Sequence, residues 1–499
     1  MSVAERFPTQ LVIGGEQVNA AAGKTFGVEN PATEQIIAQV AEGDAGDVDR
    51  AVSSARAAFE GDAWRGMSAR QRGAAVSRLG ELIVQHKDEL ARLETLNNGK
   101  PLFESAIDVN LTAETFKYYG GWADKVHGET IPVNGPYFNY TLREPLGVIG
   151  AIVPWNFPMS LAAWKIAPAL ACGNTVVLKP ATQTPFTAIR MAELGLEAGL
   201  PPGVFNCVPG EGKTAGMALV RHPQVDKIAF TGSTEVGKMV MREAAATVKK
   251  LSLELGGKSP NIVYADADLD AAARGALTGI FYGKGEVCAA GSRLLVEESV
   301  REALTAKILE RAKKMVAGDP LNPKTRLGAI VSKPQMESVL NYIKKGKDEG
   351  AQLLTGGEIA TGNGLDSGFF YRPTIFGGVE PQMRVAQEEI FGPTTALIKV
   401  GDFDEAIRVA NGIRFGLSSS IFTRDVNRAF RAMRDLEAGI TYVNAGTIGA
   451  EVHLPFGGTK DTGNGHREAG QAALDVFTEW KSIYVDYSGK LQKAQIDNS

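Results

Sequence analysis

The stretch that decides the fold class is GVIGAIVPWNFPMSLAAWKIAPALACGNTVVLKP, residues 147–180. Its first eight residues predict a short buried strand, LAAWKIAPALACG predicts an apolar helix, and TVVLKP predicts a second strand. The alternation continues through the helix TPFTAIRMAELGLEAG, the strand DKIAFTG, the helix STEVGKMVMREAAATVKK and the strand LSLELGG. Strands that alternate with helices across short loops predict an α/β fold with a parallel sheet covered by helices.

Two further regions flank this unit. Residues 47–127 predict helices because apolar residues recur at i, i+3 and i+4, and one helix should end at Gly99, before Pro101. Beyond PNIVYADAD the alternation resumes and ends near Val443, which predicts a second α/β unit. The segments NYTLREPLG and TEWKSIYVDYS are β-prone and polar on one side, and we expect them to be strands that make oligomer contacts.

Composition narrows the class of protein. The 499 residues carry 53 basic and 57 acidic side chains, a net charge of −4, with both signs interspersed. Without a basic block, neither nucleic acid nor an anionic membrane is an expected partner. No run of about eighteen apolar residues predicts a membrane span, and the N-terminus MSVAERFPTQLVIGG lacks the apolar segment of a signal peptide.

Cysteine and histidine usage narrows the compartment and the metal chemistry. The three cysteines cannot form a disulfide framework, so we expect a reducing, cytoplasmic location. None of the five histidines has metal-ligand spacing with a cysteine, so we expect no metal site.

Two motifs resemble known binding loops but lack a required residue. GEGKTAG resembles a P-loop, but Cys207 stands where its first glycine is needed. DADLD has Ala271 at the turn-glycine position of an EF-hand, and it is better explained as an acidic helix N-terminus.

The run IAFTGSTEVG suits a phosphate. It predicts a strand that enters Gly232 and a helix that opens near Ser233. A glycine at such a turn lets the backbone approach a phosphate, and the helix N-terminus attracts its negative charge. The spacing from Gly232 to Gly237 is not G-x-G-x-x-G, so an ordinary strand–helix turn remains the alternative.

Cys288 lies in GEVCAAG, among side chains too small to form a packed core. One interpretation is a small buried thiol, the usual state of a free cysteine. The other is a nucleophile, because Glu254 follows a strand in ELGG and Asn156 lies between the prolines of PWNFP. Nucleophile, base and oxyanion donor are the three roles that an acyl-transfer site must fill.

The motifs PWNFP, FTGSTEVG, LELGGKSPNIV, GEVCAAGSR, EEIFGP and PFGG resemble those of the aldehyde dehydrogenase superfamily in order and spacing. Glu254 and Cys288 are 34 residues apart (288 − 254), the interval that this family uses. The resemblance covers essentially the whole chain and implies a Rossmann-like cofactor domain, an α/β catalytic domain and a β-strand oligomerisation arm of a homodimer or homotetramer. In that order, the implied boundaries are 1–126 with 145–256, 257–458, and 127–144 with 459–499.

The resemblance also implies oxidation of an aldehyde to an acid with NAD and/or NADP. Cys288 would attack the aldehyde and carry first a thiohemiacetal and then a thioester. Glu254 would be the general base for the hydrolytic water, a role that burial supports by raising a carboxyl pKa toward neutrality. The side-chain amide of Asn156 and the backbone N–H of Cys288 would form the oxyanion hole.

Further positions match the family's motifs one by one. Lys165 and Glu468 match residues assigned either to proton relay or to a structural ion pair, and both interpretations stay open. The positions implied to contact the cofactor are Pro154, Trp155, Lys179, Thr182, Gly232, Ser233, Gly237, Leu255, Gly256, Glu389 and Phe391. Lys179 and Glu389 would bond the two riboses, and the turn at Ser233 would bond the pyrophosphate.

Thr182 predicts that the enzyme uses NADP as well as NAD. Members of the family that prefer NAD commonly carry glutamate three places after the lysine that Lys179 matches. A carboxylate there would repel a 2′-phosphate, whereas threonine does not and Lys179 attracts it. The alternative is that Thr182 only caps the helix TPFTAIRMAEL.

Two other functions remain open at this point: a coenzyme A-acylating semialdehyde dehydrogenase, and a non-catalytic binder with this fold. Acylating relatives usually lack the glutamate that Glu254 matches, and intact Cys288 and Asn156 argue against a binder. The substrate is open as well. The stretch EVHLPFGGTKDTGNGHREAG resembles members that oxidise 2-oxoglutarate semialdehyde, a narrower expectation than a general aldehyde dehydrogenase.

Overall fold

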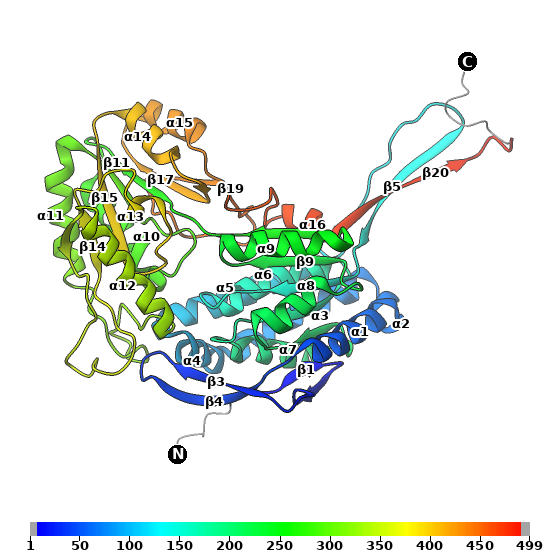
Figure 1. The fold of residues 1–499 in the computed structure, drawn as a ribbon. Coiled ribbons are helices and arrows are strands. Elements are labelled where there is room, and N and C mark those ends of the chain that lie inside the picture. Colours follow the sequence, from blue (N-terminus) through cyan, green and yellow to red (C-terminus); the bar gives the residue numbers. More distant parts are fainter. Residues whose placement is uncertain (1–6, 491–499) are drawn as a thin grey trace.

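Residues 7–490 are described by a computed structural model, in which two α/β bodies lie side by side and a two-stranded ribbon projects from one of them (Figure 1). Residues 1–6 and 491–499 lie outside the description. The start of the N-terminal segment and the last nine residues of the predicted C-terminal tail therefore lie outside it as well.

The first body contains the sheet that residues 147–180 predict. Its strand order is β10-β9-β6-β7-β8-β1-β2, and the five strands from β6 to β10 run parallel. The chain moves outward from β6 to β7 and β8, and then returns to the other side of β6 with β9, so the order reverses between β6 and β9. The strands are β1 (Leu11–Ile13), β2 (Glu16–Val18), β6 (Val148–Ile152), β7 (Thr175–Lys179), β8 (Phe205–Cys207), β9 (Lys227–Thr231) and β10 (Lys250–Glu254).

Helices cover this sheet, and polar residues begin several of them. Asp44 and Ser68 form capping boxes at the starts of α1 and α3, which satisfies backbone N–H groups that a helix start leaves free. The helical prediction for residues 47–127 is confirmed up to Gly120, beyond which the chain is not helical, and α4 ends at a left-handed Gly99 as expected. The helices are α1 (Ala45–Glu60), α2 (Asp62–Arg65), α3 (Ala69–Gln85), α4 (Lys87–Asn98), α5 (Leu102–Gly120), α6 (Pro158–Ala171), α7 (Phe186–Glu197), α8 (Met217–Arg221) and α9 (Thr234–Ala244).

The second body holds the second predicted α/β unit. Its sheet has the order β13-β14-β15-β12-β11-β17-β18, and only β13 is antiparallel to its neighbour. The strands are β11 (Pro260–Val263), β12 (Arg293–Glu297), β13 (Gln352–Thr355), β14 (Thr374–Gly377), β15 (Thr394–Val400), β17 (Ser418–Phe422) and β18 (Ile440–Val443). The helices are α10 (Leu269–Phe281), α11 (Arg301–Ala312), α12 (Lys333–Asp348), α13 (Arg384–Gln387), α14 (Phe403–Asn411) and α15 (Val426–Asp435). Asp268 caps α10, so the helical explanation of DADLD is confirmed.

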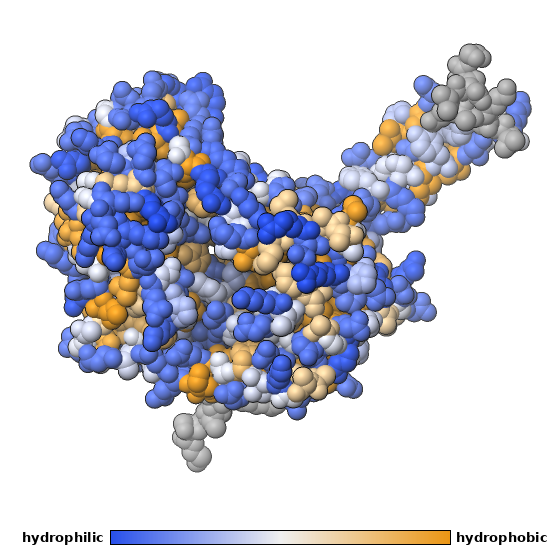
Figure 2. Space-filling view, viewed as in Figure 1, coloured by the Kyte–Doolittle hydropathy of each residue, from blue (hydrophilic) through white to orange (hydrophobic). Residues whose placement is uncertain are grey.

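The projecting ribbon pairs two strands that are distant in sequence. Strand β5 (Tyr137–Pro145) runs antiparallel to β20 (Thr478–Asp486) over nine residue pairs, and α16 (Ala472–Val476) precedes β20. Apolar and polar side chains mix on its surface (Figure 2), and Phe138, Trp480 and Tyr484 are each about half exposed. Two further pairings are the hairpin of β3 (Thr25–Asn30) with β4 (Gln35–Ala41) and the long-range pair of β16 (Phe415–Gly416) with β19 (Thr459–Lys460).

The helices of residues 7–490 do not combine the length and apolar character that crossing a bilayer requires. The division into cofactor domain, catalytic domain and arm stays a prediction. The seven-stranded sheets lie in the first two predicted parts and the β5–β20 ribbon in the third, although β19, at the start of residues 459–499, pairs with β16 of the second body.

Candidate active site

The strand ends of the first sheet bring the predicted residues together. Lys179, Thr231 and Glu254 are the last residues of β7, β9 and β10, and the loop that contains Asn156 follows β6. Parallel strands end at the same edge, and ligands bind there where the strand order reverses. The chain therefore places a carboxyl group, an amide and an ammonium group at the same edge of the sheet.

Cys288 lies on a loop of the second body that packs against Gly257, three residues after Glu254. It follows the 3₁₀ turn Tyr282–Gly285 after α10, and its side chain is partly exposed. A Cβ at Gly257 would lie 2.2 Å from the carbonyl oxygen of Cys288. Only glycine therefore lets the Cys288 loop pack against the segment that follows Glu254.

The environment of the Cys288 sulfur favours the neutral thiol. Burial, followed by the carboxylates of Glu389 and Glu254, raises the pKa of Cys288 to about 12, while the N–H groups of Ala289 and Cys288 act in the opposite direction. The thiol keeps its proton at neutral pH. Its use as a nucleophile therefore requires a base or an added positive charge.

The Asn156 amide faces the same loop. Its Nδ2 donates a hydrogen bond to the Glu286 carbonyl oxygen at 2.9 Å, while its buried Oδ1 has no partner within residues 7–490. A primary amide has two N–H groups. One is engaged, and the other remains for an oxygen bound next to Cys288.

Glu254 is buried at the end of β10, with 4% of its surface exposed. Its Oε2 has no partner among the described residues. Burial, followed by the negative charge of Glu468, raises the pKa of Glu254 well above its ordinary value, and Lys165 and Arg467 oppose this shift. The direction agrees with the expectation for a general base that works near neutral pH.

Lys165 and Glu468 form a buried ion pair beside Glu254. The Lys165 ammonium donates to Glu468 Oε1 and, at 2.6 Å, to Thr231 Oγ1. Thr231 pairs with Glu254 across the parallel strands β9 and β10. The geometry therefore contains the predicted ion pair, and a relay role stays a prediction.

Lys179 lies in a partly acidic environment. It is 5% exposed, and burial lowers its pKa to about 8 although Glu211 acts in the opposite direction. Glu211 precedes the π-helical turn Gly212–Gly216, so GEGKTAG forms a turn beside Lys179.

The turn into α9 has the predicted strand–glycine–helix form. Ser233 is the N-cap, and its Oγ accepts from the Val236 N–H at 3.3 Å. The N–H of Gly232 donates to the Glu254 carbonyl at 3.1 Å, which leaves the first turn of α9 as the anion-binding part. Gly237 is required for packing, because a Cβ there would lie 2.4 Å from Leu255 Cδ2.

Glu389 is held by the backbone that follows β10. Its Oε1 accepts from the Gly257 N–H at 2.9 Å, and a Cβ at Gly256 would lie 2.4 Å from its Oε2. Burial raises the pKa of Glu389 to about 7. The rings of Trp155 and Phe391 meet edge to face nearby, with their centroids 5.2 Å apart.

One sequence interpretation is wrong. Thr182 does not cap the helix that follows, because α7 begins at Phe186 and its N-cap is Pro185. The Thr182 hydroxyl instead lies 3.3 Å from Gln183 Oε1 in a loop. Of the remaining predicted positions, Pro154 lies in the loop after β6, and Leu255 directly follows β10, where its N–H donates to the Thr462 carbonyl.

Sequence reasoning missed a second buried ion pair, between Lys284 and Glu286, whose charged atoms are 2.8 Å apart. Lys284 has a φ of +62°, a backbone conformation that costs a non-glycine residue roughly 1–2 kcal/mol. The available signal was two charged residues inside the otherwise small-sided GKGEVC. Within the described part of the chain, no three His, Cys, Asp or Glu side chains gather as they would around a metal ion.

Comparison with known proteins is consistent over the whole chain. The sequence model described as "Aldehyde dehydrogenase family" matches residues 18–483. Retinal dehydrogenase 2 of Homo sapiens is 47% identical over 481 residues, which cover 96% of this chain and 92% of that protein. The mitochondrial aldehyde dehydrogenase of Homo sapiens is 47% identical over 485 residues, with the same coverage. The NAD⁺ complex of an aldehyde dehydrogenase from Bacillus cereus superimposes with a TM-score of 0.94 at 44% identity, covering 96% of each chain.

Proposed function

The chain belongs to the aldehyde dehydrogenase family, and on that premise we propose a role for each residue of the site. The protein is an oxidoreductase that oxidises an aldehyde to a carboxylic acid with NAD(P). An aldehyde, water and oxidised cofactor give the acid, a proton and reduced cofactor. Neither the coenzyme A-acylating reaction nor a non-catalytic role is favoured.

Cys288 is the nucleophile. Its sulfur attacks the carbonyl carbon, and the carbonyl oxygen becomes an oxyanion beside the free N–H of the Asn156 amide and the backbone N–H of Cys288. Such donors are worth about 10²–10³ in rate each. The single observation that supports this assignment is the hydrogen bond from Asn156 to Glu286, two residues before Cys288.

Glu254 acts on the water that releases the acid. Its raised pKa lets the carboxyl take a proton from water near neutral pH, and its unpartnered Oε2 is the atom that suits this step. The ion pair of Lys165 and Glu468 adjusts the charge around that carboxyl.

The chain's own residues fit a dinucleotide. When bound, NAD(P) supplies the hydride acceptor. Lys179 and the N-terminus of α9 suit its adenosine ribose and pyrophosphate, and the Glu389 carboxylate suits the other ribose. The edge-to-face pair of Trp155 and Phe391 offers a flat apolar wall for the nicotinamide.

Thr182 supports the use of both NAD and NADP, because it brings no negative charge to the loop after Lys179. Glu211 is a carboxylate near Lys179, so we do not expect NADP to be used exclusively. In Thr182→Glu, kcat/KM for NADP should fall at least about tenfold while that for NAD holds, since two like charges at 4 Å cost about 1–4 kcal/mol. Thr182→Ser is the matched control. If the ratio of kcat/KM for NADP to kcat/KM for NAD is unchanged in Thr182→Glu, Thr182 does not set the use of NADP.

The substrate we propose is a neutral aldehyde. Phe157 and Trp164 pack in the same apolar cluster as Cys288, and Trp164 meets Phe456 with centroids 5.0 Å apart. The two groups whose charge acts on the Cys288 thiol, Glu389 and Glu254, are carboxyl groups, and neither offers the positive charge that would attract an anionic aldehyde. No observation favours 2-oxoglutarate semialdehyde.

The experiment that tests this function measures NAD(P)H formation from hexanal, benzaldehyde and 2-oxoglutarate semialdehyde without coenzyme A. We expect NAD(P)H to form without coenzyme A, with the highest kcat/KM for the neutral aldehydes hexanal and benzaldehyde. Product only when coenzyme A is present would contradict the hydrolytic reaction.

The ribbon of β5 and β20 supports a homo-oligomer. It carries exposed apolar side chains far from either core, at Phe138, Trp480 and Tyr484. Three free cysteines and the absence of disulfides in the described chain are consistent with a reducing compartment, and we propose the cytoplasm.

A further inference from the structure

Five residues link the Asn156 amide to the turn before Cys288 in a closed ring. Asn156 Nδ2 donates to the Glu286 carbonyl at 2.9 Å, and Asn98 Nδ2 donates to the Trp155 carbonyl at 2.8 Å. The Lys284 ammonium donates to Asn98 Oδ1 at 2.8 Å and is ion-paired with Glu286 at 2.8 Å. The peptide bond between Trp155 and Asn156 closes the ring.

The Glu286 carbonyl fixes the direction of the Asn156 amide. A carbonyl oxygen only accepts, so the amide nitrogen must face it. The amide oxygen has no partner in residues 7–490, and this hydrogen bond is therefore the contact that orients the planar group. A displacement of the Glu286 carbonyl would rotate the second N–H away from the reacting oxygen.

The position of that carbonyl depends on an unusual turn. Gly283, Lys284 and Gly285 have φ values of +56°, +62° and +71°. Two of the three are glycines, which adopt this conformation freely, but a lysine does not. A Cβ at Gly285 would lie 2.2 Å from the Gly392 carbonyl oxygen, so the turn is also packed tightly on its far side.

The lysine side chain accounts for the strained position. Lys284 is 1% exposed, and its ammonium contacts three oxygens at 2.8 Å: Asn98 O, Asn98 Oδ1 and Glu286 Oε2. Asn98 is the last residue of α4, and its carbonyl belongs to a helix end that attracts a cation. Lys284 therefore fastens the turn to α4, and Asn98 fastens α4 to the loop of Asn156.

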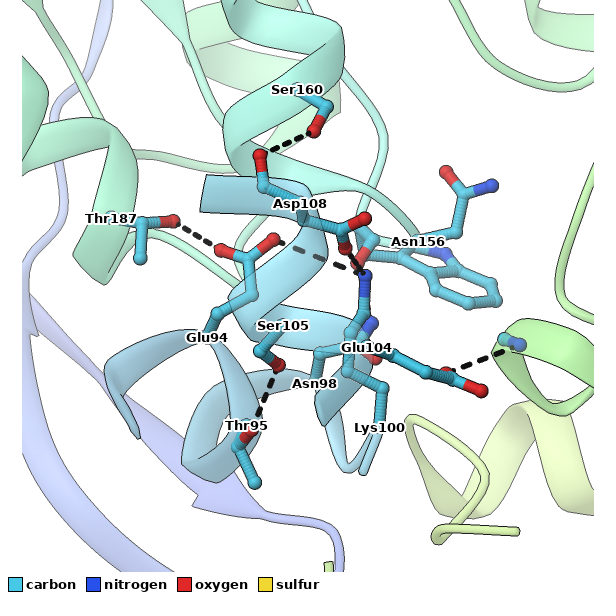
Figure 3. Close-up of polar contacts among 12 residues, drawn as sticks. Glu94, Thr95, Asn98, Lys100, Glu104, Ser105, Asp108, Asn156, Ser160 and Thr187 are labelled. Carbon is cyan, nitrogen blue, oxygen red and sulfur yellow. Dashed lines mark hydrogen bonds and ion pairs between the residues drawn. The ribbon is translucent and has the colours of Figure 1, made fainter. Parts of the chain in front are cut away.

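A neighbouring cluster on α5 holds the same two segments. Glu104 Oε2 accepts from the Gly283 N–H at 3.2 Å (Figure 3). Lys100 is paired with Asp108 at 2.6 Å, and its ammonium lies 4.2 Å from the centroid of the Phe157 ring. Asn156 lies at the edge of this cluster in Figure 3.

We propose that Lys284, Glu286 and Asn98 are positioning residues that aim the Asn156 amide at the oxyanion formed on the substrate. They act through Asn156 and do not touch the substrate themselves. The inference rests on the oxyanion role proposed for Asn156.

Two double variants that differ only at position 284 test it. Lys284→Gly/Glu286→Gln removes both charges and suits the backbone, but it has no side chain to reach Asn98. Lys284→Gln/Glu286→Gln also removes both charges and keeps a hydrogen-bond donor. We expect the single-turnover burst of NADH to fall about a hundredfold in the glycine variant, the typical cost of an oxyanion donor, and less than about tenfold in the glutamine variant. NAD binding should match between the two.

The deciding measurement repeats the glycine variant in the Asn156→Ala background. If the ring acts through Asn156, the effects are not additive, and Lys284→Gly/Glu286→Gln should lower the Asn156→Ala burst less than about threefold. A full hundredfold loss in that background would overturn the proposal. A native burst in Asn156→Ala alone would instead refute the oxyanion role, and the positioning role with it.

A second variant covers the case in which the glycine variant does not fold. Asn98→Asp has the same shape and still accepts from Lys284, but it cannot donate to the Trp155 carbonyl. It should lower the burst at least about tenfold in the native background and less than about threefold in Asn156→Ala. Equal losses in both backgrounds would overturn the proposal.

Discussion

Two buried lysine–glutamate pairs serve the site, and their surroundings differ. Lys284 contacts three oxygens, and both carboxylate oxygens of Glu286 are engaged, Oε1 by the Val331 N–H and Oε2 by the ion pair. In the other pair, Lys165 reaches Thr231 as well as its partner, but Oε2 of Glu468 is buried with no partner among the described residues. Oε2 of Glu286 accepts no hydrogen bond either, but it lies 2.8 Å from the Lys284 ammonium. We therefore call the pair of Lys284 and Glu286 the satisfied pair and the pair of Lys165 and Glu468 the incompletely satisfied pair.

This difference suggests a different role for each pair: one adjusts the pKa of Glu254, and the other positions the turn before Cys288. The incompletely satisfied pair lies close enough to Glu254 for both Lys165 and Glu468 to shift the pKa of that carboxyl, in opposite directions. The satisfied pair holds a strained turn, and it contacts the site through a backbone carbonyl. A buried carboxylate with a polar or charged partner at each oxygen is suited to fixing geometry, whereas one with a free oxygen leaves a field at its neighbours.

The largest effect is expected when the Cys288 thiol, the group next to which both pairs lie, is removed. Cys288→Ala should lower hydride transfer by about 10⁴-fold or more, because it removes the nucleophile, while NAD still binds. Single-turnover NADH formation measures this, and Cys172→Ala, a buried thiol at the end of α6, is the control that should be close to native. A native burst of NADH in Cys288→Ala would show that Cys288 is not the nucleophile. The comparison of the two ion pairs would then lose its basis, because neither pair would act on a reacting sulfur.

The next largest effect distinguishes a defect after the thioester forms from a defect before it. Glu254→Gln keeps the shape of the side chain but cannot take a proton, so steady-state turnover should fall about 10²–10⁴-fold. The thioester on Cys288 should accumulate and be visible as an added acyl mass in the intact protein. Lys284→Gly/Glu286→Gln should show no such accumulation, because its defect precedes the thioester. Native turnover in Glu254→Gln would exclude the base role.

The third effect tests the electrostatics at the sulfur. Because the pKa of Cys288 is raised to about 12, the thiolate fraction should grow about tenfold per pH unit from pH 6 to 9, without a plateau. The rate of alkylation by iodoacetamide, followed by mass, measures this in the enzyme without cofactor. Lys284→Gly/Glu286→Gln should give the same slope, since that pair does not charge the sulfur. A plateau below pH 8 would mean that the thiol is already activated.

The smallest effect compares the members of the incompletely satisfied pair. Glu468 raises the pKa of Glu254, so Glu468→Gln should move the rising limb of thioester hydrolysis to lower pH. Lys165 lowers the same pKa, so Lys165→Met should move that limb to higher pH, each by about one unit, or 1.4 kcal/mol. Hydrolysis of a preformed acyl-enzyme, measured between pH 5 and 9, gives both limbs. Shifts of the same sign would show that the pair acts only on structure.

Much of the fold could be predicted from local pattern. Short apolar runs that end at a proline or a glycine predicted β6, β7 and β9. Gly99, Ser233 and Asp268 marked helix ends through chemistry that acts within a few residues. Thr182 shows the limit, because threonine suits an N-cap, but the chain begins α7 only after Pro185. A propensity identifies which residues can cap a helix, and tertiary packing decides which one does.

The sequence by itself determined the α/β class and the family motifs, and it predicted Cys288, Glu254 and Asn156 as site residues, because each belongs to a short pattern with its own chemistry. Only the tertiary structure decided that Asn98, 190 residues before Cys288 (288 − 98), contacts both Lys284 and the Trp155 carbonyl. Burial likewise decided that the pKa values of Cys288 and Glu254 are both raised, since desolvation is the largest cause of both shifts. Desolvation and hydrogen bonds between distant segments depend on how the two bodies pack, which no local pattern records.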